Sequence, residues 1–441
     1  MEGSVLRTII RLAGPTVIGS LSLMSVGIMQ LYFVGLLGVE ALAGVTLVFP
    51  ALTLMQLTAS SGIGAGVASA VARGIGAGRR ADAEALVLNA LFLAIVGGIA
   101  FAAAGLLLGP GIYRWMGGTG GALAASVAYS NWIFAASVVV WILGLLLGAL
   151  VGCGNTLVPL IASLSALAMV PLSPALMFGW GPLPPLGIAG AGLAFAVYYL
   201  AASIALIGYY RSGHAPLRLS LDIRLIQRRL LMDILRVGAP AALAAAIPIF
   251  SIGLITAAVG RFGINEVAGY GIAIRADYML LPLYVGICAG IVPMVGTNVG
   301  AGQIRRARQI AWTGALMAAG IGGFAGLALA LAPSLWVGLF SHDPKVAGSG
   351  ALYFHIVGIQ FPLSALAVVL SAAAQAAGRA SWPLAAITSR LTVAAGGSWL
   401  VVSGFDGSLE ALYAMLAIGS ICYCGVISAG QIAGLTIPDR T

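Results

Sequence analysis

Charge is what this sequence lacks most. Only 7% of its 441 residues are charged, whereas 61% are apolar and the mean hydropathy is +1.08. A soluble domain is about a quarter charged, and a globular core cannot absorb this much hydrocarbon because too few polar side chains remain to cover its surface. The composition therefore excludes soluble enzymes, nucleic-acid-binding proteins and disordered proteins, and it predicts an integral membrane protein.

Histidine and cysteine are also scarce. The chain has three His and four Cys, and the cysteines lie in apolar runs without the spacing of metal ligands. We interpret Cys153, Cys288, Cys422 and Cys424 as small hydrophobic side chains. A membrane-embedded enzyme needs clustered His, Asp or Glu at a membrane face. We therefore predict that the protein is not an enzyme and has no metal site and no cofactor.

Long apolar runs are what the sequence does have. A helix needs about 20 apolar residues to cross the hydrocarbon core of a bilayer. Charged residues divide the chain into six such stretches before residue 211 and six after residue 236. We therefore predict an all-α integral membrane fold with twelve transmembrane helices. The stretches are 12–39, 41–72, 85–113, three within 115–210, 237–260, 267–297, 309–340, 346–376, 381–404 and 409–436.

Arginine predicts the orientation, because cytoplasmic loops carry an excess of basic residues. With the N-terminus inside, 16 of the 21 basic residues lie in predicted cytoplasmic segments, three lie outside and two lie within spans. Both termini are therefore predicted to be cytoplasmic. The net charge of +9, spread this thinly, indicates contact with anionic lipid headgroups rather than nucleic acid.

The two halves of the chain resemble each other. Three pairs of short segments carry the repeat: 11–15 with 236–240, 75–78 with 299–302, and 154–160 with 378–384. The shift is 225 residues for the first pair and 224 for the other two. Because each half has an even number of helices, we predict two six-helix bundles related by a pseudo-twofold axis along the membrane normal. Repeats of this kind favour a secondary transporter over a channel or a membrane enzyme.

The repeat predicts three parts of the chain. Residues 1–210 form an N-terminal six-helix bundle, 211–236 form a cytoplasmic linker, and 237–441 form a C-terminal six-helix bundle. Apolar and Arg residues alternate in the linker, which indicates a helix lying in the membrane interface.

Several Gly- and Ala-rich stretches resemble those of multidrug and toxic compound extrusion (MATE) transporters, most closely the DinF-like bacterial branch. They are 33–44 at the end of the first helix, the loops 76–78 and 300–302, residues 152–159, and 187–191 at the start of the sixth helix. The motifs cover nearly the whole chain.

This resemblance implies two bundles arranged as a V around a central cavity, in a bacterial inner membrane. It implies export of organic, often cationic compounds by alternating access, driven by inward flow of protons or sodium. We expect a monomer whose partners are small organic substrates and membrane lipids.

The sequence departs from the family pattern where coupling is usually placed. The family's frequent Asp in the first helix corresponds to Gln30, and its Asp before Pro in the fifth helix corresponds to Ser173. Neither Gln nor Ser exchanges a proton near neutral pH, and sodium prefers charged oxygen ligands. We therefore expect coupling to use another residue, with the proton favoured over sodium.

Three charged residues lie inside predicted spans, where charge is costly and marks candidate functional sites. They are Arg275 and Asp277 in the eighth helix and Arg390 in the eleventh. Asp277 and Arg390 each lie about 13–15 Å deep by helical rise, so we expect them to meet inside the C-terminal bundle. Asp277 is either a permanent salt-bridge partner of an Arg or a binding site for a proton or a cationic substrate. An Arg in the cavity favours an anionic substrate instead.

Neutral polar residues within spans either line the cavity or hydrogen-bond between helices. They are Gln30, Gln56, Asn89, Gln360 and Gln375. His355 is either a proton carrier or a satisfied bundle histidine.

Two other transporter classes share part of this pattern. A major-facilitator carrier has the same parallel repeat, but its loop after the second helix carries Asp-Arg, which residues 73–80 do not match. A flippase for lipids or lipid-linked molecules is the second alternative, and the Arg residues of the C-terminal half favour it.

Overall fold

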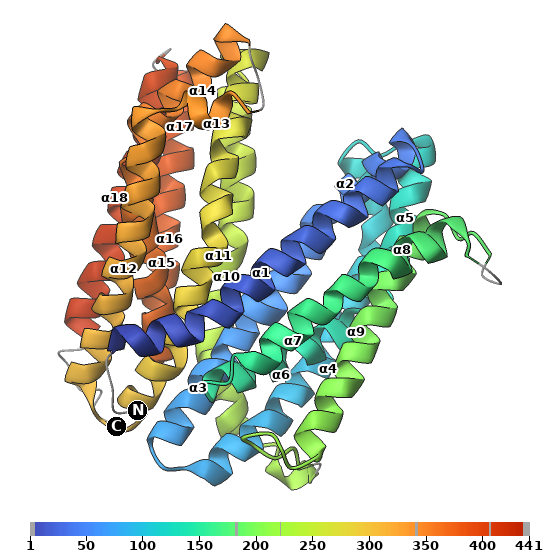
Figure 1. Ribbon diagram of the computed structural model, residues 1–441, viewed down its shortest axis with the longest axis vertical. Helices are drawn as coiled ribbons and strands as arrows, with labels where there is room; N and C mark the ends of the chain where they lie inside the picture. Colours follow the sequence, from blue (N-terminus) through green and yellow to red (C-terminus); the bar gives the residue numbers. More distant parts are fainter. Residues whose placement is uncertain (1–4, 181–183, 221, 340–342, 405–406, 435–441) are drawn as a thin grey trace. The chain divides into compact units, whose positions relative to one another are not determined.

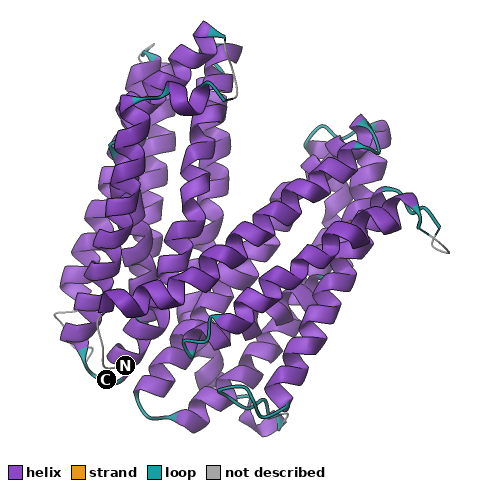
Figure 2. Cartoon of the chain, in the orientation of Figure 1, coloured by secondary structure: helices purple, strands orange, loops and turns teal. Residues whose placement is uncertain are grey.

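The computed structural model describes residues 5–180, 184–220, 222–339, 343–404 and 407–434. These residues form helices and connecting loops, and no strand occurs among them (Figure 2).

The first half of the chain forms six membrane-length segments (Figure 1). They are α1 (Val5–Gly35); α2 (Val39–Leu57), a π-helix (Thr58–Ile63) and α3 (Gly64–Gly76) in series; α4 (Arg80–Trp115); α5 (Gly120–Ala135) with α6 (Ser137–Gly152); α7 (Leu157–Ser165), a 3₁₀ turn (Ala166–Ala168) and α8 (Met169–Phe178); and α9 (Ile188–Arg211).

The second half repeats this order after a 3₁₀ turn (Ile223–Leu225). Its elements are α10 (Arg228–Val259), α11 (Ile264–Gly300), α12 (Ile304–Leu331), the short α13 (Ser334–Val337), α14 (Pro344–Val357) with α15 (Gln360–Ala376), α16 (Ser381–Leu391), a π-helix (Thr392–Gly396) and α17 (Gly397–Gly404) in series, and α18 (Leu409–Gly434).

Length and composition give ten described helices that can cross a membrane, and twelve when each of two bent helix pairs is taken as one span. The bent pairs are α5 with α6, at 49°, and α14 with α15, at 58°. The predicted all-α fold with twelve spans is confirmed.

The repeat is visible in the turns as well as in the bends. Gly78 and Gly302, 224 residues apart, have φ values of 73° and 74°. The residue after each glycine donates its backbone N–H to a carbonyl five residues back, from Arg79 to Gly74 at 2.9 Å and from Gln303 to Asn298 at 2.8 Å. Positive φ is open to glycine at little cost, so both loops have the same chain reversal.

Contacts divide the chain into two compact units. The N-terminal unit is Pro15–Ala242, and the C-terminal unit combines Met1–Gly14 with Leu243–Thr441. The predicted boundaries at residues 210 and 236 follow the repeat along the sequence, whereas the contacts assign 1–14 to the C-terminal unit and 211–242 to the N-terminal unit.

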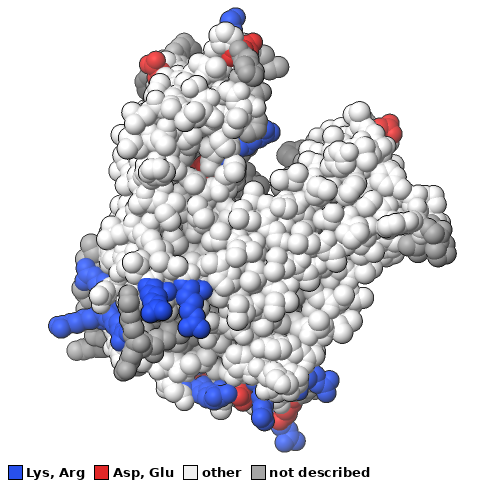
Figure 3. Space-filling view, viewed as in Figure 1, with Lys and Arg blue, Asp and Glu red and all other residues white. Residues whose placement is uncertain are grey.

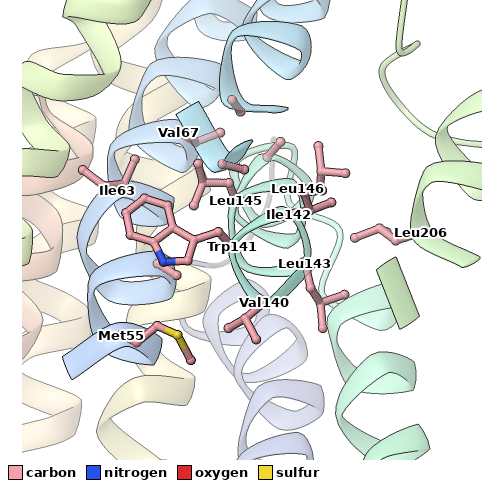
Figure 4. Packing of buried hydrophobic residues seen from close by; sticks show 14 of the residues in the cluster. Met55, Ile63, Val67, Val140, Trp141, Ile142, Leu143, Leu145, Leu146 and Leu206 are labelled. Atoms are coloured by element: carbon pink, nitrogen blue, oxygen red, sulfur yellow. The ribbon is translucent and has the colours of Figure 1, made fainter. Parts of the chain in front are cut away.

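The core of the N-terminal unit lies around α6. Figure 4 shows Trp141 beside Ile63 and Leu145 in this core, and Leu145 is fully buried. A Cβ at Gly148 would lie 2.6 Å from the backbone oxygen of Gly64. The backbones of α6 and α3 therefore touch, which is the usual way small residues bring membrane helices together.

The segment that follows α9 is fixed to the N-terminal unit. The Asn89 side chain donates to the carbonyl of Leu225 at 2.9 Å and accepts from the N–H of Gln227 at 3.1 Å. Arg229 and Asp82 form an ion pair at 2.9 Å. Asn89 thus holds the linker and does not line a cavity.

In place of the predicted separate interfacial helix, residues from Arg228 onward are the first turns of α10, which continues to Val259. The apolar residues Leu230 and Ile234 are 3% and 0% exposed in the core of the N-terminal unit. The apolar period in the linker therefore serves helix packing rather than a surface helix.

In the C-terminal unit, α12 packs closely on α15. A Cβ at Gly322 would lie 2.7 Å from the carbonyl oxygen of Phe361, and one at Gly326 would clash with the carbonyl oxygen of Gly358. One buried cluster joins α11, α12 and α15, and a second surrounds Tyr270 and Tyr353. These two clusters position the charged residues described next.

Candidate functional site

Asp277 lies near the middle of α11 and is half-buried. Tyr270 and Tyr284 lie seven residues before and after it, so the three share one face of the helix. Both tyrosines are buried, at 2% and 3% exposure. The carboxyl group therefore faces an aromatic part of the C-terminal unit.

Arg390 lies in the last turn of α16, directly before the π-helix Thr392–Gly396. The charges of Asp277 and Arg390 interact, but no hydrogen bond or ion pair to Asp277 is formed within the described parts of the chain. The two charges therefore interact without a hydrogen bond or ion pair between the two side chains.

Tyrosines from three helices of the C-terminal unit, α11, α14 and α18, pack against one another. Tyr270, Tyr353 and Tyr413 contact one another, with ring centroids 5.8, 6.4 and 5.4 Å apart. Tyr270 and Tyr353 also interact with the charges of both Asp277 and Arg390. We call Tyr270, Tyr353 and Tyr413 the tyrosine cluster.

Aromatic contact also orients Arg390. Its guanidinium carbon lies 5.9 Å from the centre of the Tyr423 ring, within reach of a cation–π interaction. The Tyr423 and Ser371 hydroxyls are 3.1 Å apart and hydrogen-bonded. π-helical turns occur often at functional sites because the extra residue re-aims the side chains around it, and this one follows Arg390 directly.

The structure does not bring every predicted residue to this site. Arg275 is exposed on α11, two residues from Asp277. His355 is exposed on α14, whereas its neighbours Tyr353 and Phe354 are buried. The His355 side chain therefore points away from the face that carries the tyrosine cluster.

The predicted glutamines lie in different surroundings. Gln56 donates to the Tyr199 hydroxyl at 2.9 Å and so joins α2 to α9. The Gln30 amide nitrogen is buried and has no hydrogen-bond partner among the described residues. Gln375 is half-buried on α15, and Gln360 on the same helix accepts a hydrogen bond from Ser420 at 2.7 Å.

The positions that correspond to the family's usual acids are uncharged in the N-terminal unit. Ser173 is fully buried, and its hydroxyl lies 3.4 Å from the sulfur of Met177. The described carboxylates of this unit lie at helix starts or in the linker: Glu40, Asp82, Glu84, Asp222 and Asp233. The candidate site of this chain is therefore in the C-terminal unit.

Sequence reasoning missed the tyrosine cluster, because its members are far apart along the chain. The seven-residue spacing of Tyr270, Asp277 and Tyr284 was the one signal that pointed to it. Two hydroxyls of the C-terminal unit, those of Tyr284 and Ser364, are buried without a described partner.

A twelve-span helical protein with an internal repeat and one charged pair inside a bundle has the features of a secondary membrane transporter. The MatE family model matches residues 15–177 and 240–400. The chain therefore belongs to the MatE family of transporters, as the sequence resemblance predicted.

Individual relatives and solved structures are also similar to this chain. The chain is 27% identical to an FAD transporter of Shewanella oneidensis, over 95% of this chain and 93% of the relative. It is 26% identical to the probable multidrug resistance protein YoeA of Bacillus subtilis, over 79% and 76%.

A structure of MATE in the bent conformation matches with a TM-score of 0.90 at 22% identity, covering 98% of this chain and 96% of that one. A MOP superfamily transporter from Pyrococcus furiosus matches with a TM-score of 0.88 at 21% identity, covering 100% and 98%. One of the two relatives is named as a transporter and the other as a probable multidrug resistance protein.

Proposed function

We propose that the protein exports small organic compounds in exchange for protons, with Asp277 as the coupling carboxylate. The observation that carries the proposal is the position of Asp277. It is the one described carboxylate in the interior of a span, whereas the others lie within the first two helical turns or in loops. A group kept there at the cost of its desolvation is a functional candidate.

The exchange follows from charge balance. When Asp277 is ionised, its negative charge compensates the guanidinium of Arg390. A proton that binds a carboxylate oxygen of Asp277 removes this charge and leaves Arg390 uncompensated, so the pair changes from neutral to +1. A cationic substrate competes with the proton for the same carboxylate. Binding that is mutually exclusive at one site is what antiport requires.

An exposed aromatic ring supports the other half of a binding site. Tyr278, next to Asp277 on α11, is 44% exposed and interacts with the charges of Asp277 and Arg390, whereas the tyrosine cluster is buried. Aromatic faces attract organic cations and also give flat apolar area to drug-like molecules. Polar groups at fixed positions are what make a binding site select one substrate over another. Because few such groups lie around Asp277, the site selects weakly among organic substrates. This supports a broad range of organic substrates, exported across a bacterial inner membrane.

The proton is favoured over sodium as the coupling ion because few oxygen ligands are available around Asp277. Sodium is a hard cation that needs several oxygen ligands, preferably charged. Asp277 offers one carboxylate among aromatic rings, and the N-terminal unit offers Gln30 and Ser173 at the positions of the usual acids.

A second candidate substrate class is organic anions. Arg275 and Arg390 outnumber Asp277 within the spans, which gives these three residues a net charge of +1. A relative that aligns over 95% of this chain is named an FAD transporter. In this version the flavin nucleotide is held by Arg residues and stacked on aromatic rings.

Proteoliposomes with an acidic lumen and a pH-sensitive dye distinguish the two classes. We expect ethidium, an aromatic cation, to collapse the pH gradient in vesicles that contain the protein and not in empty vesicles. FAD is the matched aromatic anion. A response to FAD alone would replace the cationic class by the anionic one, and a response to neither compound would overturn the export proposal.

A further inference from the structure

Helices α16 and α18 pack closely at Arg390. A Cβ at Gly419 of α18 would lie 3.2 Å from the carbonyl oxygen of Arg390, so the backbones of the two helices touch there. A Cβ at Gly430, further along α18, would meet the ring of Trp382 near the start of α16. Because residue numbers rise along α18 as they fall along α16, the two helices run antiparallel, and the base of the Arg390 side chain is fixed against α18.

This register brings the Arg390 guanidinium over the ring of Tyr423. Tyr423 follows Gly419 by four residues, so the two share one face of α18. A helical side chain leans toward the N-terminus of its own helix, and on α16 this is the direction from Gly419 to Tyr423. The guanidinium carbon lies 5.9 Å from the centre of the Tyr423 ring. The backbone packing and the ring contact therefore give the same position for the Arg390 side chain.

The Tyr423 ring is itself held in place. It is 5% exposed and lies in the same buried cluster as Ile291 and Val369. The hydroxyls of Tyr423 and Ser371 are 3.1 Å apart and share a hydrogen bond that joins α18 to α15. The ring cannot turn away without breaking this bond and opening the core, so it presents a rigid aromatic face to the guanidinium.

Two groups attract Arg390, the ring of Tyr423 and the charge of Asp277. Opposite charges attract strongly where little water lies between them, so an unrestrained guanidinium would close on the carboxylate. No ion pair between Asp277 and Arg390 occurs in the part of the chain that the structure describes. The contact with the ring is the interaction that opposes closure.

We propose that Tyr423 is a positioning residue that keeps Arg390 over its ring and away from Asp277, so that the carboxylate can take up and release a proton. This role rests on the proton exchange proposed for Asp277. It assigns a function to a residue that contacts neither the proton nor the substrate.

Charge is sparse around the pair. On the face shown in Figure 3, few charged side chains are visible along the C-terminal unit, and most of them lie near its ends. Tyrosines interact with the charge of Asp277, and they stay neutral below about pH 9. They are Tyr270, Tyr278, Tyr284 and Tyr353.

Other titratable or charged side chains occur on the helices that pack against α11 and Arg390. Helices α12, α13, α14 and α15 pack against α11, and α18 packs against α16. Helices α13 and α15 have no such side chain. The others are Glu266, Arg275 and Cys288 on α11, Arg305, Arg306 and Arg308 on α12, Lys345 and His355 on α14, and Glu410, Tyr413, Cys422 and Cys424 on α18. A titration must therefore isolate Asp277 from Glu266, His355 and Glu410.

Infrared titration of the purified protein makes this separation. The C=O stretching band of a protonated carboxyl group, after subtraction of the same protein with Asp277→Asn, gives the midpoint pH at which Asp277 takes up a proton. We expect Tyr423→Leu to bind the proton about tenfold more weakly, with a midpoint about 1 pH unit lower, because the released guanidinium approaches the carboxylate. Ser371→Ala, which loosens the ring without removing it, should lower the midpoint by a smaller amount.

Three controls separate the ring contact from other effects. Tyr423→Phe keeps the aromatic face, so its midpoint should stay closer to that of the wild type than the midpoint of Tyr423→Leu. Tyr210→Leu removes a buried tyrosine of the other unit, whose hydroxyl donates to the Leu146 carbonyl at 2.8 Å, and should not change the midpoint. In an Arg390→Gln background, Tyr423→Leu should also have no effect, because the proposed route passes through the guanidinium.

An unchanged midpoint in Tyr423→Leu would overturn the proposal. An equal shift with and without Arg390 would do so too, because the ring would then act on Asp277 directly, and an equal shift in Tyr210→Leu would show a general effect of lost stability. Infrared titration measures proton binding and not transport. A midpoint that depends on Tyr423 in a protein that moves no substrate would refute the antiport alone, whereas proton-coupled transport with a midpoint independent of Tyr423 would refute the positioning role alone.

Discussion

A carboxylate in the interior of a span is costly, and Asp277 forms no direct ion pair within the described part of the chain. An acid locked in a buried pair is difficult to protonate, because removing one charge leaves the other unpaired. The longer-range interaction between Asp277 and Arg390 gives a smaller barrier to exchanging the proton. At the scale of the residue, this separation suits a switch better than a structural salt bridge.

Cysteine chemistry gives an independent test of how the turns pack. Burial raises the pKa of the Cys153 thiol, in the turn after α6, to about 12, although Arg80 opposes the shift. The thiol therefore stays protonated at pH 8, and only a very small fraction is the reactive thiolate.

We predict that a variant with Cys153 as its single cysteine reacts with a maleimide at pH 8 about 50-fold more slowly than an exposed thiol. The reference is Ser212→Cys in the same cysteine-free background, because Ser212 is exposed. Equal rates for the two thiols would show that the turn is open to solvent.

For single residues the sequence predicts position along a helix better than the direction of the side chain. Helical rise predicts similar depths for Asp277 and Arg390, and this depth stays a prediction. The same counting does not say which face of α14 carries His355, and that face is exposed. Tyr270, Tyr353 and Tyr413 come from three helices, so only tertiary packing brings them together.

Glycines set the distances between helices. In the N-terminal unit, Gly148 of α6 lies against the backbone of Gly64, and Gly152 lies against that of Ala68, where a Cβ would be 2.5 Å from the carbonyl oxygen. An added methyl group must push two helices apart along a contact without flexible side chains.

We predict that Gly148→Ala lowers the stability of the protein by about 2–4 kcal/mol. Gly208→Ala is the matched control, because Gly208 is also helical and a Cβ there meets nothing within 4 Å. That control should be neutral or slightly stabilising, since alanine favours the helix. The measurement is the thermal unfolding midpoint in one detergent, and equal midpoints for the two variants would contradict the packing described for α6.

The apolar pattern of the linker is compatible with two different helices. The leucines and isoleucines between residues 221 and 235 fit an interfacial helix and equally fit the first turns of a packed one. The hydrogen bonds of Asn89 to the linker and the burial of Ile234 show that the packed helix forms. A local sequence pattern contains no information on either contact. The π-helices after α2 and α16 likewise carry no recognisable sequence signal.

For the whole molecule, the sequence predicts more than it does for any single site. Charge spacing gave the spans, and the shift of 224 residues gave the repeat that the bends and the glycine turns confirm. These features are predictable because the bilayer requires an apolar segment of spanning length in every helix that crosses it. The site depends on a few contacts, and their geometry is not a property of composition.

The topology is open to a direct test. We predict that Ser212→Cys is labelled by a membrane-impermeant maleimide only in inside-out vesicles, and that Thr119→Cys is labelled only in right-side-out vesicles, both without the native cysteines. The reason is the excess of Arg on the predicted cytoplasmic side. Both positions are exposed, so the opposite labelling pattern would reverse the orientation.

The exchange of a proton for substrate at Asp277 can be measured directly. The measurement is substrate-dependent proton release from energised inverted membrane vesicles, comparing wild type with Asp277→Asn at equal membrane levels, and with Asp82→Asn as a carboxylate control at the start of α4. We expect proton release in the wild type and in the Asp82→Asn control, and loss of release in Asp277→Asn. Undiminished release in Asp277→Asn would contradict it and make Asp277 a structural partner of Arg390.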